Sequence, residues 1–133
     1  MSAKVLDSFA LIAYFRDEPG AETVEKLLVA AGKEDSPLHM TEVKYAEVKY
    51  SIVKRDGTEA WEEAAKILQG LPIDFHSTTR ELADTAADFK ARFPMSLADA
   101  FAAALAKEKK AELVTGDPEF KAVEKEIKVV WLK

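Results

Sequence analysis

Short apolar runs alternate with helical segments along the whole chain, and no other feature of the sequence restricts the fold as much. The runs are typical of strands and lie at 5–6, 37–41, 72–75, 111–115 and 127–132. Strands that alternate with helices favour an α/β fold with a parallel sheet, because each crossover helix packs back onto the sheet. We therefore predict a three-layer α/β/α architecture whose central sheet has about four or five mainly parallel strands.

Between these runs, apolar residues recur at helical spacing, and cap and stop signals bound the segments. The predicted helices cover 8–15, 21–31 before a stop at Gly32, 41–55, 58–69, 78–92 and 96–109. The last four begin at a Ser or Thr that can cap a helix, and Thr78 with Glu81 forms a capping-box pattern. A turn is predicted at 116–118, where Gly, Asp and Pro follow one another.

The length of 133 residues suits one well-buried core, so we expect a single domain over 1–133. The chain has no cysteine and two histidines, which excludes thiolate ligands and argues against a histidine-rich zinc site. His39 and His76 lie in or beside predicted strands, where we expect core or edge positions. A metal ion would therefore be held by oxygen atoms.

The net charge of −5 has the wrong sign for binding nucleic acid through a broad basic surface. A polyanionic substrate would need metal ions or a local basic rim. The candidates for the rim are Arg16, Lys44, Lys49, Lys54 and Arg55, with a solvated helix face as the favoured alternative for most of them. The sequence has neither an apolar run of about 18 residues nor a pattern typical of a secretory leader. We therefore expect a cytoplasmic protein without membrane partners.

Four carboxylates stand where α/β proteins usually place a site, at the carboxyl ends of strands and on inward helix faces. Asp7 and Asp117 follow predicted strands. Glu47 lies on the partly apolar stripe of its helix, and Asp99 lies at the start of the Ala-rich helix with alanines beneath it. A carboxylate on an inward face is costly unless it is paired or binds a metal ion.

Local roles explain three of these residues separately. Asp7 is placed to form a turn or to cap a helix, Asp117 precedes a proline in a turn, and Asp99 forms a capping-box variant with Ser96. One shared site explains all four carboxylates, and their mutual repulsion would destabilise the fold without a cation. Carboxylate oxygens suit Mg²⁺ or Mn²⁺, so we predict such an ion at this site.

Four phrases occur in the order and at the spacing of a known family: VLDSFALIAYF, TEVKYAEVKYSIVKR, MSLADAFAAALA and LVTGDPEF. On these phrases the chain resembles PIN-domain ribonucleases, in particular the short VapC-type toxins of type II toxin–antitoxin systems. The resemblance runs essentially from end to end. It implies a PIN-like fold and a Mg²⁺-dependent endoribonuclease in which a metal-activated water hydrolyses RNA, leaving a 5′-phosphate and a 3′-hydroxyl.

The resemblance also implies roles for individual residues. It places the family's catalytic, metal-binding acids on four residues: Asp7, Glu47, Asp99 and Asp117. It makes Ser8 and Thr115 supporting hydroxyls that orient a carboxylate or a water. Family members often carry Asn three residues before the helix glutamate; here that position is Lys44, which we expect to contact a phosphate.

Three partners follow from the resemblance. They are an RNA substrate, a cognate antitoxin whose tail enters the acidic groove, and a second copy of the chain in a homodimer. Aromatic groups near Phe15, Tyr45 and Tyr50 are candidates for the dimer contact, with burial in the core as the alternative.

Three other functions remain open at this point. A housekeeping PIN nuclease in RNA processing would have the same site, and an inactive PIN fold would only bind protein. A receiver-like signalling domain also places Asp at strand ends, but it needs a phosphoacceptor Asp after its third strand and a Lys after its last one. Asp74 lies inside its predicted strand and Lys133 ends the sequence, which argues against that class.

Overall fold

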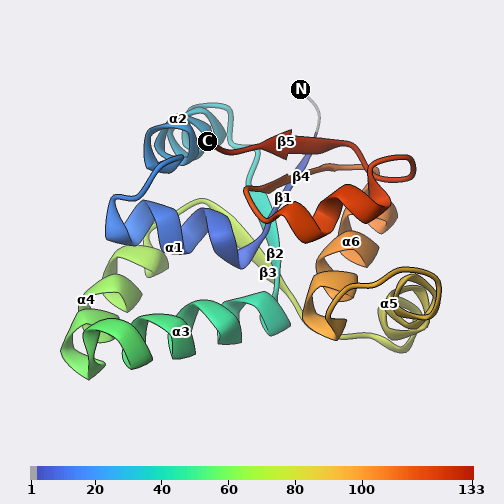
Figure 1. The fold of residues 1–133 in the computed structure, drawn as a ribbon. Helices are drawn as coiled ribbons and strands as arrows, with labels where there is room; N and C mark the ends of the chain where they lie inside the picture. The colour runs from blue at the N-terminus through green and yellow to red at the C-terminus, as the bar shows by residue number, and fades with distance from the viewer. Residues whose placement is uncertain (1–2) are drawn as a thin grey trace.

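The computed structural model describes residues 3–133 (Figure 1). In this part of the chain, three strands are each followed by a pair of helices, and the last two strands flank a short 3₁₀ helix. The elements are β1 (Lys4–Leu6), α1 (Ser8–Arg16), α2 (Ala21–Lys33), β2 (Leu38–Thr41), α3 (Glu42–Asp56), α4 (Thr58–Gln69), β3 (Ile73–His76), α5 (Arg80–Arg92), α6 (Leu97–Lys109), β4 (Glu112–Thr115), η1 (Pro118–Val123) and β5 (Val129–Trp131).

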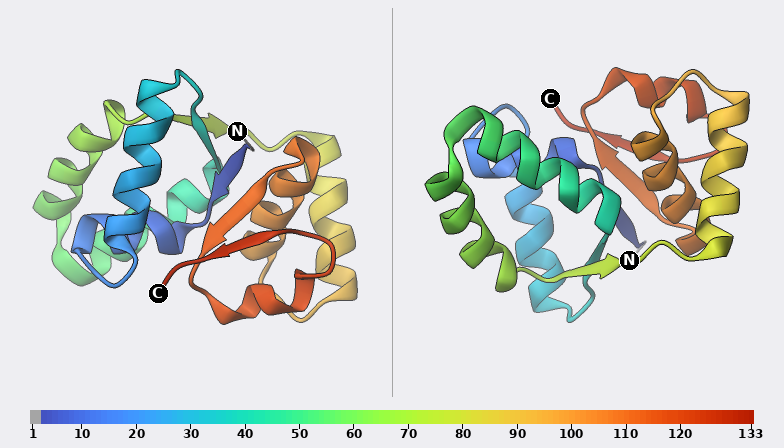
Figure 2. Two further views of the ribbon diagram at one scale, coloured as in Figure 1. Left: turned by 90° about the horizontal axis from the view of Figure 1, so that it is seen from above. Right: turned by 90° about the horizontal axis from the view of Figure 1, so that it is seen from below.

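The strands of residues 3–133 form one five-stranded sheet in the order β3-β2-β1-β4-β5, and every neighbouring pair is parallel. Helices α1 to α4 cover one face of the sheet and α5 and α6 cover the other (Figure 2). The predicted three-layer α/β/α fold is therefore confirmed, and its sheet is entirely rather than mainly parallel.

Each face of the sheet has its own hydrophobic core. Met40 and Trp61 belong to the core under α1 to α4, and Phe89, Leu105 and Phe120 belong to the core under α5 and α6. Most buried side chains of α6 are alanines, which let this helix lie close against the sheet. The start of α6 is therefore held firmly at the sheet's carboxyl edge.

Four local predictions were wrong by small amounts. Helix α2 continues through Gly32 to Lys33, because an exposed glycine in a helix costs only about 1 kcal/mol. Gly57, with φ of 97°, is the N-cap of α4, so Thr58 is its first helical residue and not its cap. Thr79 and not Thr78 caps α5, since its hydroxyl accepts a hydrogen bond from the Leu82 N–H.

The fourth difference lies after β4. The predicted turn leads directly into η1, with Pro118 as its first residue, where the fixed φ of proline suits a helical start. Strand β5 covers Val129–Trp131, the middle of its predicted range. Among residues 3–133, no helix is both long and apolar enough to cross a bilayer.

Strand β1 lies at the point where the strand order reverses. It pairs with β2 on one side and with β4 on the other, and the Asp7 N–H extends the second ladder to the Val114 carbonyl at 3.1 Å. Ligands of open parallel sheets bind at such a switch point, outside the carboxyl ends of the strands. The residues that follow β1, β2 and β4 are therefore the first place to look for a site.

The two histidines form a contact between β2 and β3, to one side of the switch point. His39 on β2 and His76 on β3 place Nδ1 and Nε2 2.9 Å apart, so one ring nitrogen donates and the other accepts. Burial lowers the pKa of His39, the charges of His76 and Lys109 act in the same direction, and Asp74 opposes them. His76 lies on the edge strand β3, and His39 is half-buried on the inner strand β2, in keeping with the expected edge and core positions.

This contact predicts an acid-sensitive contribution to stability. Because the pKa of His39 is lower in the folded state than in the unfolded chain, the unfolded state binds more protons as the pH falls below about 6.5. The stabilisation that depends on neutral His39 is complete above that pH, and it is lost as the pH falls through the pKa of His39 in the folded state. We expect His39→Gln to flatten the dependence of the free energy of unfolding on pH between about 5 and 7.5. Urea titrations of both proteins test this, and parallel pH profiles would contradict it.

Candidate functional site

Three carboxylates meet at the carboxyl edge of the sheet. Asp7 follows β1, Glu47 lies in the second turn of α3, and Asp99 lies in the first turn of α6. Each offers a carboxylate oxygen, and these oxygens all lie within 4.8 Å of one another. We call Asp7, Glu47 and Asp99 the inner group. The N-terminal ends of α1, α3 and α6 lie near one another in Figure 1.

The side chain of Asp7 does not cap its helix. Asp7 occupies the N-cap position of α1 but makes no side-chain cap hydrogen bond. Its Oδ2 accepts a hydrogen bond from the Thr115 hydroxyl at 2.7 Å, and the residue is 1% exposed. The local explanation of Asp7 as a helix cap is therefore wrong, and the charge that interrupts the apolar N-terminal run belongs to a site built with β4.

The capping role near Asp99 belongs to Ser96 alone. The Ser96 hydroxyl accepts a hydrogen bond from the Asp99 N–H at 3.1 Å, as the predicted pattern requires. The carboxylate of Asp99 is left to contact the inner group. Its place in the first turn of a 13-residue helix is favourable for a negative charge, because the positive end of the helix dipole faces it.

A second set of carboxylates adjoins the first. Oxygens of Asp99, Asp117 and Glu119 also lie within 4.8 Å of one another, and we call these residues the outer group. The Asp117 carboxylate accepts a hydrogen bond from the Glu119 N–H at 2.9 Å, so its local role as a turn former is correct as well. Asp99 is common to both groups.

Sequence reasoning missed Glu119. It stands on η1, which was predicted only as a turn, and it is exposed. The available signal was its place two residues after Asp117, in the segment that follows the predicted strand 111–115. A 3₁₀ turn over these residues brings both carboxylates to the same side.

Lys44 occupies the middle of the inner group. Its Nζ lies 2.9 Å from Asp7 Oδ1, 2.6 Å from Glu47 Oε1 and 2.5 Å from Asp99 Oδ1, and its side chain is 2% exposed. The prediction that Lys44 contacts a phosphate from a basic rim is therefore wrong. A lysine that binds the RNA backbone needs an ammonium group exposed to solvent. The ammonium of Lys44 has three N–H donors, and the three carboxylates of the inner group surround it.

The charges of the inner group are strongly coupled. Burial alone would lower the pKa of Lys44, but attraction to Asp7 and Asp99 and hydrogen bonds to Asp99 and Glu47 raise it above its usual value. Burial raises the pKa of Asp99, Lys44 opposes this, and repulsion from Asp7 and Asp117 adds to it. One ammonium against three carboxylates leaves two negative charges uncompensated. The site thus keeps an attraction for further cations.

Two hydroxyls join the carboxylates, as expected. The Ser8 hydroxyl donates to Glu47 Oε1 at 3.1 Å. The Thr115 hydroxyl donates to Asp7 and accepts from the Asp117 N–H at 3.0 Å, so it connects the two groups. Their effect on activity stays a prediction, as do the catalytic roles of Asp7, Glu47, Asp99 and Asp117.

The predicted basic rim is smaller than its five candidates. Arg16 forms ion pairs with Glu18 and Asp56, and Lys44 is buried. Lys49, Lys54 and Arg55 remain, and they are exposed on α3. Among the aromatic candidates for a dimer contact, Phe15 and Tyr45 are half-buried against the core, while Tyr50 is 56% exposed.

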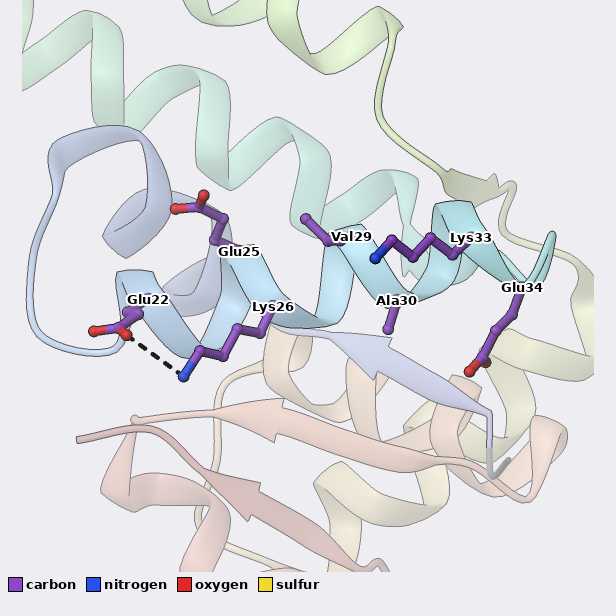
Figure 3. Close-up of a pocket in the computed structure, with 7 residues that line it drawn as sticks. All are labelled: Glu22, Glu25, Lys26, Val29, Ala30, Lys33 and Glu34. Carbon is purple, nitrogen blue, oxygen red and sulfur yellow. Dashed lines mark ion pairs between the residues drawn. The ribbon is translucent and has the colours of Figure 1, made fainter.

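A surface hollow on α2 has no part in this site. Figure 3 shows its seven lining residues, which run from Glu22 to Glu34 along α2 and its C-cap. Charged side chains surround Val29 and Ala30, and Lys26 pairs with Glu22 at 3.4 Å, one helical turn away. Such a face is typical of a solvated helix, and no carboxylate of the inner or outer group lines it.

The donor set is compatible with a divalent metal ion. Both groups offer carboxylate oxygens, which Mg²⁺ and Mn²⁺ prefer. The outer group is partly open to solvent, whereas Lys44 fills the centre of the inner group. The residues therefore fit a metal ion at the outer group, and at the inner group only without the ammonium.

Comparisons with known proteins agree with this fold. Three similar solved structures are VapBC2 from Rickettsia felis bound to a promoter DNA fragment, DNA-bound VapBC from Salmonella typhimurium, and the sarcin-ricin loop cleaving toxin VapC20 from Mycobacterium tuberculosis. Their TM-scores are 0.80, 0.75 and 0.74, at 14%, 17% and 18% sequence identity. The matches cover 98%, 98% and 91% of this chain and 99%, 98% and 95% of those chains.

At these identities the solved structures establish the fold alone. No curated protein matches the sequence. The family model of the PIN domain matches residues 4–126, which is nearly the whole chain of 133 residues. The chain therefore belongs to the PIN-domain family.

Proposed function

We propose that the chain is a metal-dependent endoribonuclease and the toxin of a type II, VapBC-type toxin–antitoxin pair. One observation carries the proposal: the carboxylates of Asp7, Glu47 and Asp99 converge at the switch point of a PIN-domain sheet, and Asp117 and Glu119 adjoin them. Carboxylates this close are costly unless they serve to bind cations. A metal-dependent nuclease needs such a cluster to hold metal ions against a phosphodiester.

The outer group is the part of the site that would hold the metal ion. Asp99, Asp117 and Glu119 face one another there, and Thr115 fixes the backbone of Asp117. A bound Mg²⁺ or Mn²⁺ would lower the pKa of a water and stabilise charge on the phosphate. The residues of the chain position the carboxylates and, through Lys44 and Ser8, keep the inner group in place.

RNA is the proposed substrate. VapC20 of Mycobacterium tuberculosis, which shares the fold, is a sarcin-ricin loop cleaving toxin. Lys49, Lys54 and Arg55 on α3 would offset the net charge of −5 where the RNA backbone approaches. We expect products with a 5′-phosphate and a 3′-hydroxyl.

An antitoxin is the proposed protein partner. Two of the similar structures are VapBC complexes bound to DNA. The two uncompensated negative charges of the inner group would attract a basic side chain of such a partner. A homodimer, with Tyr50 as a contact, and a cytoplasmic location complete the proposal.

A second candidate is a PIN fold that binds a protein partner without cutting RNA. The observation that favours it is the position of Lys44, whose ammonium pairs with three carboxylates that would bind metal ions in a nuclease. A housekeeping nuclease would share the site of a toxin. A neighbouring gene for a small antitoxin-like protein separates the toxin from the housekeeping enzyme.

Cleavage assays on purified, antitoxin-free protein test the proposal. We expect a panel of structured and single-stranded RNAs to include at least one that is cut with Mg²⁺ or Mn²⁺, and no cutting in EDTA. End labelling should detect 5′-phosphates on the products. Cutting that persists in EDTA would contradict metal dependence. A folded protein that cuts no RNA would favour the binding module.

A further inference from the structure

We infer that the Lys44 ammonium is a built-in cation of the inner group, and that a divalent ion binds Asp7, Glu47 and Asp99 only by displacing it. The inference rests on the proposed metal site but not on RNA cleavage. It assigns Lys44 a role as a positioning residue that competes with metal ions. It also confines metal binding in the intact protein to the outer group.

The geometry leaves no room for both cations. Nζ lies 2.5 to 2.9 Å from one oxygen of each inner carboxylate. Mg²⁺ bonds to such oxygens at about 2.0–2.1 Å. An ion bonded to the same three oxygens would therefore occupy the volume that Nζ fills.

Lys44 is fixed in place by the surrounding structure. Its N–H donates to the capping hydroxyl of Thr41 at 2.9 Å, which sets the residue at the start of α3. Its side chain is almost fully buried, and Nζ lies 5.9 Å from the centre of the Phe120 ring. A flexible lysine on the surface would have neither this hydrogen bond to Thr41 nor a buried side chain. Displacing the amine requires breaking three ion pairs and moving a packed side chain.

The ammonium also makes the carboxylates compatible with a folded state that lacks metal ions. Among the described residues, every buried polar side-chain atom has a hydrogen-bond partner. Without Lys44, three carboxylates within 4.8 Å would face one another with no positive charge between them. Removing one partner of a buried ion pair is strongly destabilising, because the remaining charges stay buried. A metal ion would then have to supply the missing charge.

Thermal unfolding and Mn²⁺ titration of four proteins test the inference. They are the wild type, Lys44→Met, Lys44→Asn and the control Lys54→Met, which removes an exposed lysine of the same helix. We expect Lys44→Met to lose about 10 °C of Tm in EDTA and to regain at least half of it in excess Mn²⁺. Calorimetry should find Mn²⁺ binding about 10-fold tighter or more in both Lys44 variants than in the wild type and the control.

Equal Mn²⁺ affinity in the wild type and both Lys44 variants, with Tm values independent of EDTA, would overturn the inference. If the Lys44 variants do not fold, Glu47→Gln decides, because Glu47 belongs only to the inner group. The Mn²⁺ affinity of the Glu47→Gln protein should differ from that of the wild type by less than about 3-fold. A loss of affinity beyond about 10-fold would overturn the inference. No readout uses RNA, so inactivity in cleavage assays contradicts the proposed function and leaves this result intact.

Discussion

Asp99→Asn should reduce metal-dependent RNA cleavage by about 100-fold or more, the largest loss we expect from a single carboxylate. Residues that only orient metal ligands typically cost about 10- to 100-fold when replaced, so a direct ligand should cost at least the upper end. Asp99 is the one residue that belongs to both the inner and the outer group. Losing the Asp99 carboxylate therefore removes a metal ligand from the outer group and an ion pair from Lys44.

The same substitution should leave the fold intact. The cap of α6 uses the Ser96 hydroxyl and the backbone N–H of residue 99, neither of which changes. Asparagine matches aspartate in size, and burial already raises the pKa of Asp99, so the neutral side chain relieves an existing cost. We expect Tm to change by only a few degrees. Initial cleavage rates and melting curves are the measurements.

Asp84→Asn is the matched control, because Asp84 is exposed on α5 and lies in neither group. It should cleave RNA at the rate of the wild type. A folded Asp99→Asn protein that also cleaves at that rate would remove the carboxylates from the mechanism. The site would then have to lie elsewhere on the protein.

The layers of the fold could be predicted because they depend on local patterns. Each short apolar run and each helical repeat reports its own element, and a parallel sheet follows from their alternation. The same reasoning placed Asp7 and Asp117 at the carboxyl edge, since the ends of parallel strands share one edge of the sheet.

The position of the Lys44 amine could not be predicted in this way. Its spacing to Glu47 is a local helical pair, but Asp99 lies 55 residues away along the chain, and only the packed structure brings it within 2.5 Å. A lysine on a polar helix is usually solvated, so the sequence indicated a solvent-exposed amine at Lys44. Glu119 was missed for a related reason, because the 3₁₀ turn that orients it has no strong sequence signal.

Thr115→Val should destabilise the protein by about 2–4 kcal/mol and lower RNA cleavage by about 10-fold or more. The hydroxyl of Thr115 donates to Asp7 and accepts from the Asp117 N–H, and the residue is 0% exposed. Valine keeps the shape of the side chain but leaves a carboxylate oxygen and an N–H without that partner. Each unsatisfied buried group costs about 1–3 kcal/mol.

Thr115→Ser separates the hydrogen bonds from packing, because it keeps the hydroxyl and removes only a methyl group. We expect it to lose about 1 kcal/mol and to retain most of the cleavage rate. Urea unfolding and initial rates measured on both variants give the comparison. If the valine and serine variants were equally stable and active, the bridge between the inner and outer groups would have no energetic role. Among the contacts of the described residues, the Thr115 hydroxyl is the only hydrogen-bonding link between Asp7 and Asp117. A loss of stability and activity in the valine variant alone would therefore show that this one buried oxygen aligns the inner and outer groups.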